Sequence, residues 1–298
     1  MRVAAACFAA AALAAAAPCR AQTAPDAVAR LIAASGAEVA VAFQTLDGAS
    51  RLLIRPDVEF HAASTMKLPV MIELFRQARD GALRLDERMP VTNTFHSIVD
   101  GSPYTLDPGD DSDNDVYAHV GGELSYRQLC EAMITKSSNL AANLLIERLG
   151  PANIQKTTDA LGAGAMHVLR GVEDNKAFER GLNNTTTARA LMTIMLAIAG
   201  GRAGDAASTR EMIAILERQA FNDRIPAGLP RGLVIAHKTG EITKIRHDAA
   251  IVYAPRPFVL VVLIRGLEDG RQADALAAGI AAAVYADPAW NLAAAPRP

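Results

Sequence analysis

The chain has 298 residues and a formal net charge of −2, and hydrophobic residues make up 51% of the sequence. A chain of this length and composition can bury a substantial core, in one large domain or in two interleaved ones. No basic stripe and no basic–aromatic interleaving occurs, which argues against a nucleic-acid-binding protein. The expected partner is therefore a small molecule or the cell wall, and we expect a monomer.

The first residues have the features of a secretory signal. Arg2 supplies a short positive region, an alanine-rich apolar stretch covers 3–17, and cleavage is predicted after Ala21. The apolar stretch is shorter than the roughly 20 residues that span a bilayer, which argues against a stable membrane anchor. Acylation of Cys19 is an alternative, but Pro18 fits poorly before a lipoprotein cysteine. We expect an exported protein, periplasmic or secreted.

The chain after the signal begins with mixed elements and then becomes helical. A short helix is expected at 26–34, followed by strands at 38–46 and 51–59. Residues 64–219 have a helical rhythm, with apolar residues at helical spacing over 124–134 and 140–149. Two helix starts are predicted further on: Thr187 as an N-cap, and Ser208 with Glu211 as a capping box.

The last region returns to strands rich in Val and Ile, at 232–238, 248–253 and 258–264, and closes with a helix at 271–285. Strands near both ends of the chain predict an α/β fold of the α+β type. An antiparallel sheet with flanking helices would accompany an all-helical lobe. The predicted division is a signal peptide at 1–21, an α/β lobe from 22–63 and 220–298, and a helical lobe at 64–219.

Two local features, a single cysteine and an acidic loop, could carry chemistry. Cys130 is the only cysteine left after cleavage, so no intramolecular disulfide is possible, and its apolar helical context predicts a buried thiol. Five aspartates crowd one loop, which could indicate a calcium site. The EF-hand pattern is not matched, and a solvated acidic loop is favoured. We therefore expect no metal and no cofactor. The five aspartates of this acidic loop are Asp107, Asp110, Asp111, Asp113 and Asp115.

The segment Ser64-Thr65-Met66-Lys67 offers a candidate nucleophile. Its continuation has helical periodicity, so Ser64 and Lys67 are expected on one helix face, three residues apart. Pro69 places Ser64 at the start of that helix, because proline is poorly tolerated deeper in. A serine hydroxyl needs such a neighbouring base to become an effective nucleophile.

Two further polar clusters lie far away in the sequence. Ser137-Ser138-Asn139 lies in the turn between two predicted helices, where a hydroxyl and a carboxamide can face a cleft. Lys238-Thr239-Gly240 ends a predicted strand, where a cation and a hydroxyl suit a substrate carboxylate. The glycine permits close approach to the strand edge.

Together, and in this order, the three clusters resemble the signature of the class A β-lactamases and penicillin-binding proteins. The resemblance covers nearly the whole mature chain and includes Thr185-Thr186-Thr187 after the expected Ω-loop. It implies no cofactor and the following roles. Ser64 is acylated, Lys67 relays its proton, Ser137 protonates the leaving nitrogen, Asn139 holds the acylamide, Lys238 and Thr239 bind a carboxylate, and the backbone N–H groups of Ser64 and Glu241 form the oxyanion hole.

The match is weaker where deacylation is concerned. The family uses an Ω-loop glutamate with an asparagine four residues later. Here Glu173 is the candidate base with Asp174 as an alternative, and Ala177 stands at the asparagine position while Asn175 could replace it.

The loop-closing arginine–aspartate pair is also altered. Arg170 faces Asn184, so the ion pair is either lost or rerouted to Asp174 or Glu179. Ser138 stands where an aspartate is usual, and the charged Glu241 is an unusual neighbour of the oxyanion hole.

Several other residues are candidates for a role at the site. Arg246 is either a second carboxylate anchor or a solvated arginine. His247-Asp248 could complete a triad with Ser64, but a structural histidine at a strand start is favoured. Tyr104 could stack on substrate, but a surface tyrosine in a loop is favoured. No zinc-lactamase cluster and no G-x-S-x-G elbow is present.

The preferred function is β-lactam hydrolysis through a Ser64 acyl-enzyme. The alternatives are a penicillin-binding D,D-peptidase, an esterase or a glutaminase of the same fold, or a binding or sensing domain that stays acylated.

Overall fold

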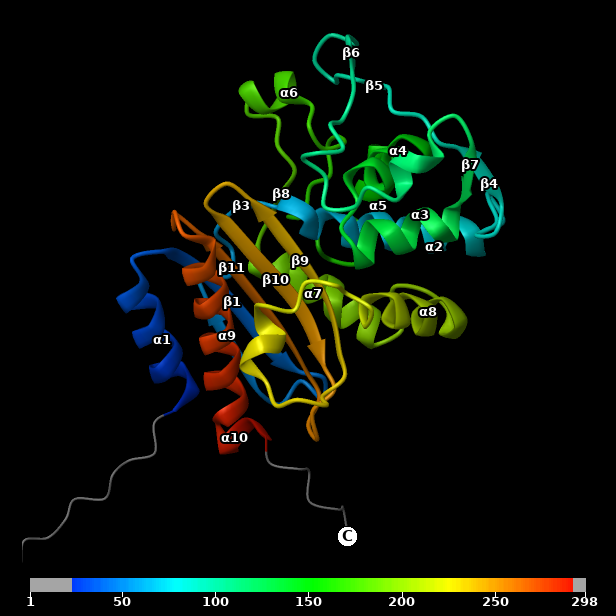
Figure 1. The fold of residues 1–298 in the computed structure, drawn as a ribbon. Coiled ribbons are helices and arrows are strands. Elements are labelled where there is room, and N and C mark those ends of the chain that lie inside the picture. Colours follow the sequence, from blue (N-terminus) through cyan, green and yellow to red (C-terminus); the bar gives the residue numbers. More distant parts are fainter. Residues whose placement is uncertain (1–22, 292–298) are drawn as a thin grey trace, which may run out of the picture.

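The computed structural model describes residues 23–291, so the predicted signal peptide lies outside the described residues. Its centre is a five-stranded antiparallel sheet in the order β2-β1-β11-β10-β9 (Figure 1). The first two strands come from the N-terminal part of the chain and the other three from the C-terminal part. The prediction of a sheet built from both chain ends is confirmed. The strands are β1 (Glu38–Thr45), β2 (Arg51–Ile54), β9 (Ile235–Ile242), β10 (Ile245–Val252) and β11 (Phe258–Arg265).

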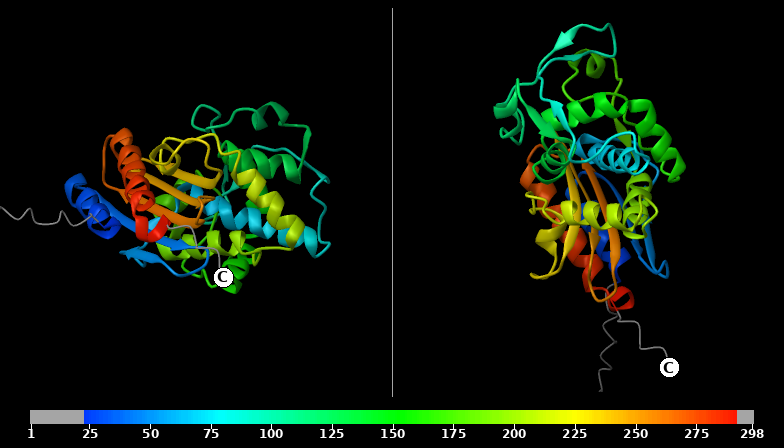
Figure 2. Two further views of the ribbon diagram at one scale, coloured as in Figure 1. Left: turned by 90° about the horizontal axis from the view of Figure 1, so that it is seen from below. Right: turned by 90° about the vertical axis from the view of Figure 1, so that its right-hand side faces the viewer.

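The central strands are buried on both faces because helices cover the sheet on each side. In β11 seven consecutive residues are buried, which explains its unbroken Val, Leu and Ile run. On one face, α1 (Ala24–Ser35) packs on α9 (Gly270–Ala286), with α10 (Pro288–Asn291) after it (Figures 1 and 2). The Ala24 N–H donates to the Asp287 carboxylate at 2.8 Å, which joins the two ends of the described chain.

The opposite face is covered by α7 (Ala188–Ala199), which contacts β1, β10 and β11. This helix lies within the range predicted as a separate helical lobe, yet it packs on the sheet. The other helices lie farther from the sheet or at its edge (Figure 1). They are α2 (Lys67–Arg79), α3 (Tyr126–Thr135), α4 (Asn139–Leu149), α5 (Pro151–Ala160), α6 (Asn175–Glu179) and α8 (Ala206–Leu216).

Short elements connect these helices. Three are 3₁₀ turns: η1 (Ala63–Met66), η2 (Val116–His119) and η3 (Ile225–Gly228). Three are antiparallel strand pairs: β3 (Phe60–His61) with β8 (Thr185–Thr186), β4 (Arg88–Pro90) with β7 (Glu123–Ser125), and β5 (Phe95–His96) with β6 (Pro103–Tyr104). The β3–β8 pair joins the segment before Ser64 to the threonine run.

Most predicted boundaries agree with the structure to within a few residues, and three do not. Thr187 caps α7 by accepting from the Ala190 N–H, as predicted. The Ser208–Glu211 capping box is wrong, because Asp205 caps α8 and Ser208 lies inside the helix. The predicted strand 51–59 ends at Ile54, and β9 continues past the Lys238 cluster to Ile242.

The structure agrees with the prediction for Cys130 but only in part with that for the acidic loop. Cys130 is buried and unpaired, and burial raises the pKa of its thiol to about 12, as expected for an inert side chain. The acidic loop is only partly solvated: Asp113 is buried and Asp111 is half-buried. No group of acidic, His or Cys side chains within residues 23–291 could hold a metal ion. No helix in that range combines the length and apolar character needed to cross a membrane.

Candidate active site

A cleft of about 960 Å³ brings residues from distant parts of the chain together. Side chains from the helical segments and from the strands β9 and β10 face each other across it. The predicted site residues that line it are Ser64, Ser137, Asn139, Glu173, Thr239, Glu241 and Arg246. Lys67 and Lys238 are fully buried beneath the cleft floor.

Ser64 lies in η1, which continues directly into α2. It is half-buried and faces the cleft, with Lys67 one helical turn later. Ala63 has a positive φ of 45°, so the turn before the serine is held in a conformation that L-residues seldom adopt. The Ala63 N–H donates to His61 Nδ1 at 3.0 Å, which helps to hold this turn.

Lys67 is held by the second polar cluster. Its amine donates to the Ser137 carbonyl at 2.6 Å, to Ser137 Oγ at 3.3 Å and to Asn139 Oδ1 at 2.8 Å. Complete burial lowers the pKa of Lys67 to about 7, although the nearby Asp111 and Glu173 carboxylates act in the opposite direction. A lysine with such a pKa can hold or release a proton near neutral pH.

Lys238 approaches the same hydroxyl from the sheet. Its amine donates to Ser137 Oγ at 3.0 Å and to the Thr239 carbonyl at 2.9 Å. Burial lowers the pKa of Lys238 well below its usual range, and repulsion from Lys67 and Arg224 adds to this effect. Ser137 thus lies between two lysine amines, with a positive φ of 60° that fixes its turn.

Gly240 permits the close approach of β9 to η1. A Cβ at this position would lie 3.0 Å from Thr65 Cγ2 and 3.2 Å from the Ser64 backbone nitrogen. β9 is the edge strand of the sheet, so part of its backbone is free to face the cleft. This arrangement fits the predicted oxyanion hole of the Ser64 and Glu241 N–H groups.

Glu173 lies on the opposite wall of the cleft. Its carboxylate accepts from Asn139 Nδ2 at 3.0 Å, so Asn139 bridges Lys67 and Glu173. Burial raises the pKa of Glu173, as do the nearby Asp111 and Asp110 carboxylates, while the Asn139 hydrogen bond opposes the rise. Its partner is therefore Asn139. Within residues 23–291, Asn175 makes no hydrogen bond to Glu173.

Asp174 has a structural role that sets it apart from Glu173. Its carboxylate caps α6 at Ala177 and accepts from Ser97 Oγ and from the Ile98 N–H. Burial alone would raise the pKa of Asp174, but these hydrogen bonds outweigh it and the pKa is lowered. A carboxylate that is fully engaged in this way is a poor candidate base.

The loop that carries Glu173 is closed by amide contacts in place of an ion pair. Asn184 accepts from the Leu169 and Arg170 N–H groups and donates to the Arg170 carbonyl. The Arg170 guanidinium donates to backbone carbonyls and to Asn183. Of the two predicted alternatives the structure shows the loss of the pair: within residues 23–291 Arg170 forms no ion pair with Asp174 or Glu179.

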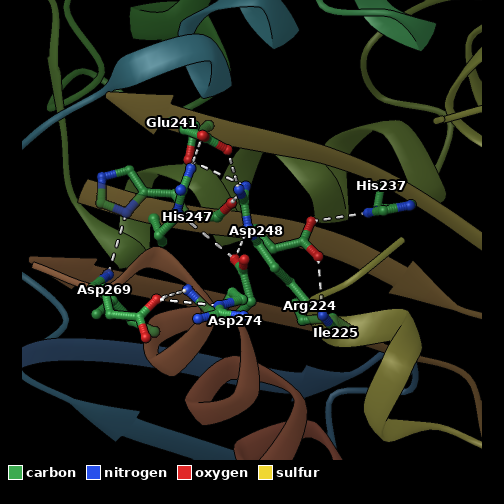
Figure 3. Close-up of polar contacts among 12 residues, drawn as sticks. Arg224, Ile225, His237, Glu241, His247, Asp248, Asp269 and Asp274 are labelled. Atoms are coloured by element: carbon green, nitrogen blue, oxygen red, sulfur yellow. Dashed lines mark hydrogen bonds and ion pairs between the residues drawn. The ribbon is translucent and has the colours of Figure 1, made fainter. Parts of the chain in front are cut away.

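Burial and hydrogen bonding decide whether His247 can take part in a triad with Ser64. His247 is fully buried; its Nε2 donates to the His61 carbonyl at 3.0 Å and its Nδ1 accepts from the Ile264 N–H at 3.2 Å. Asp248 points elsewhere and contacts His237 and the Ile225 N–H (Figure 3). The possible triad with Ser64 is therefore wrong, and His247 is structural. Tyr104 is half-buried beside Phe95 and does not line the cleft.

The acidic loop supplies a residue that sequence reasoning missed. The Asp111 carboxylate accepts from the Asn139 and Leu140 N–H groups at 2.9–3.0 Å, which places a negative charge at the start of α4. Ser138, where the resemblance leads one to expect an aspartate, caps Ala141 with its hydroxyl. The carboxylate comes from a segment 28 residues away, so no local sequence signal could have indicated it.

Comparisons with known proteins show the family to which the chain belongs. The model of a family described as the beta-lactamase enzyme family matches residues 23–287. A beta-lactamase of Bacillus licheniformis is 30% identical over 231 residues, 75% of this chain and 70% of the relative. A beta-lactamase of Streptomyces albus G is 29% identical over 256 residues, 81% of this chain and 79% of the relative.

Solved structures show the same relationship. A mutant of the class A beta-lactamase of the last common ancestor of Gram-negative bacteria superposes with a TM-score of 0.76 at 28% identity. The alignment covers 88% of this chain and 97% of the other. PBP-A superposes with a TM-score of 0.72 at 27% identity, covering 87% and 94%. The chain belongs to the beta-lactamase enzyme family and is a serine β-lactamase-type hydrolase with the two-lobed class A fold.

Proposed function

We propose that the protein opens the amide bond of β-lactams through an acyl-enzyme on Ser64 and releases the product with Glu173 as the base. The observation that carries the proposal is the shared cleft, which Ser64, Ser137 and Glu173 line. The buried Lys67 amine contacts Ser137 directly and is linked to Glu173 through Asn139. A PBP-A mutant with this fold has been solved as an acyl-enzyme complex with penicillin G.

In the acylation step Ser64 Oγ attacks the carbonyl carbon and its proton passes to the neutral Lys67 amine. The developing oxyanion lies against the N–H groups of Ser64 and Glu241. The C–N bond then breaks, and Ser137 gives its hydroxyl proton to the leaving nitrogen while the protonated Lys67 amine passes the proton taken from Ser64 on to Ser137. Ser137 suits this role because both lysine amines contact its hydroxyl.

Deacylation requires a base that activates water opposite the acyl group. Glu173 suits it by position and by its raised pKa, which brings the carboxylate closer to the pH at which it must accept a proton. The amide of Asn139 orients that carboxylate from the other side.

Export completes the proposal. The alanine-rich apolar stretch at 3–17, with Arg2 before it and small residues after it, supports secretion to the periplasm or beyond. That destination would place the enzyme where β-lactams meet the cell wall.

The test asks whether the protein hydrolyses substrate repeatedly and whether the acyl-enzyme accumulates when Glu173 is replaced. Purified protein should hydrolyse a chromogenic cephalosporin many times per molecule, and Ser64→Ala should abolish the reaction. Glu173→Gln should give one equivalent of product and then stop, with a stable mass increase of one opened drug per protein, because acylation persists and deacylation falls by about 10²–10⁴-fold.

Glu179→Gln is the matched control, since it removes an exposed glutamate from the end of α6, the short helix that follows Glu173. It should turn over like the parent protein. Undiminished turnover in Glu173→Gln would exclude Glu173 as the base. A single burst from the unmodified protein would favour the peptidase or sensing alternatives.

A further inference from the structure

The part of the cleft beside Thr239 holds two arginines whose charges are already matched by two carboxylates. Glu241 on β9 and Arg246 on β10 are register partners in the antiparallel sheet, so their side chains lie on the same face. They form an ion pair there. Arg246 also lies 3.9 Å from the Asp274 carboxylate.

Arg224 completes this group from beneath. Its side chain is only 6% exposed, and it contacts Glu241 and Asp274, each at 2.6 Å (Figure 3). It also donates to the carbonyls of Gly240 and His247. The charges of Arg224, Arg246, Glu241 and Asp274 therefore balance without any ligand.

The group is confined on its far side by α9. A Cβ on Gly270 would lie 2.1 Å from Arg246 Nη2, so the guanidinium packs directly against the backbone at the start of α9. Glu241 is different, because its side chain is 55% exposed and lines the cleft. It is thus the member of the group that faces an incoming substrate.

We propose that Glu241 is a specificity-determining residue, which competes with a substrate carboxylate for Arg224 and Arg246 and so favours substrates with an uncharged leaving group. The inference rests on the proposed function and deepens it. A β-lactam with a free carboxylate must displace Glu241 from the guanidinium groups before it can use them, whereas a neutral ester or amide has no such requirement.

The surroundings of Glu241 suit an uncharged group. Phe221 and Ile242 line the same cleft, with 37% and 38% of their surface exposed. Lys238 offers little to an anion directly, because its buried amine is held by Ser137 and by the Thr239 carbonyl. Exposed apolar side chains would instead cover an apolar leaving group.

The experiment uses benzylpenicillin and its methyl ester, two probes that differ only at the carboxyl group, which is charged in the acid and neutral in the ester. We expect Glu241→Gln to raise the ratio of kcat/KM for the acid to that for the methyl ester by about tenfold or more. Glu241→Ala, which removes the side chain altogether, should raise it in the same direction. The rate on the methyl ester reports whether each variant has kept an intact site.

Glu268→Gln is the matched control. It removes the same charge from the cleft lining, but Glu268 pairs with Lys244 and not with either arginine. Its ratio should stay within about twofold of the parent value if only the contacts of Glu241 matter. Adding Arg246→Ala to Glu241→Gln should remove most of the gain.

The experiment distinguishes a failure of this inference from a failure of the proposed function. An unchanged ratio in both Glu241 variants, with the methyl ester still hydrolysed, would overturn the role of Glu241. An equal gain in Glu268→Gln would overturn it too, because it would show a general field effect. Failure of the parent protein to react with either probe at Ser64 would instead refute the proposed function.

Discussion

The Lys67 amine is the group whose protonation governs the chemistry of Ser64. Burial lowers its pKa to about 7, so the lysine is mostly charged below neutral pH and mostly neutral above it. Only the neutral amine can take the proton of Ser64. Three acceptors from Ser137 and Asn139 stabilise the charged form, so the amine must lose a proton from this arrangement before it can act as the base.

Acylation should therefore show an acid limb near pH 7. The second-order rate of acylation by a chromogenic cephalosporin should fall about tenfold per pH unit below that value and level off above it. The rate should be measured by stopped flow in Glu173→Gln, where deacylation does not interfere. A limb that persists there, moved to lower pH because the Glu173 charge no longer raises the pKa of Lys67, assigns it to Lys67, and one that vanishes assigns it to Glu173.

Lys67→Arg provides the check on this assignment. Its guanidinium keeps the positive charge but does not lose a proton in this pH range. Acylation in this variant should be slow at every pH, without the limb. If Lys67→Arg retained the parent profile, the base would be another group.

At the scale of elements, the approach of β9 to η1 forms the site. A Cβ on Gly240 would meet Thr65 at 3.0 Å and the Ser64 nitrogen at 3.2 Å, so Gly240→Ala must shift one element by a few tenths of an ångström. We expect acylation to fall by about 10–10²-fold, since misplaced oxyanion donors are costly. The unfolding free energy, measured in urea, should fall by only about 1–2 kcal/mol.

Gly279→Ala is the matched control for that substitution. Gly279 lies inside α9, and its added Cβ would make ordinary contact with Leu31 at 3.6 Å. Acylation should be unchanged and stability equal or higher, because alanine suits a helix interior better. Equal losses of activity in both variants would contradict the argument for β9.

Sequence reasoning located the elements better than their ends. The Val and Ile runs and the helical spacing identified β11, α4 and α9 because burial on known faces imposes those periods. The cap of α8 was misplaced, since Asp205 and Ser208 are both good capping residues and only the tertiary path of the chain selects Asp205. Local pattern alone does not distinguish such neighbours.

At the scale of the whole molecule, the three motifs were predictable and their partners were not. Ser64, Ser137 and Lys238 lie in recognisable segments, and their convergence follows from the sheet that both chain ends build. The partners of these motifs lie in loops and on neighbouring strands. Asp111 reaches α4 from 28 residues away, and Glu241 meets Arg246 across a strand pair. Such contacts depend on loop paths and on strand register.

His247 ties the sheet to the nucleophile segment, and this makes the stability of the whole protein sensitive to acid. The buried ring donates to the His61 carbonyl and accepts from Ile264, an arrangement that only the neutral form satisfies. Burial lowers its pKa to about 4 in the folded state, against about 6.5 in an unfolded chain. Between these two pH values the unfolded state therefore binds a proton that the folded state does not bind.

The contribution of the neutral His247 to the free energy of unfolding should accordingly be complete above pH 6.5 and should fall as the pH decreases toward 4. Between pH 7.5 and pH 5 the loss should be about 2 kcal/mol, measured from urea midpoints. Burial lowers the pKa of His61 as well, so the contribution of His247 is the part of this loss that disappears when His247 is replaced. His247→Gln should be less stable at pH 7.5 but much flatter with pH, while the exposed His96→Gln should follow the parent. A parent protein with no loss of stability by pH 5 would show that the junction between sheet and nucleophile segment does not depend on a neutral ring.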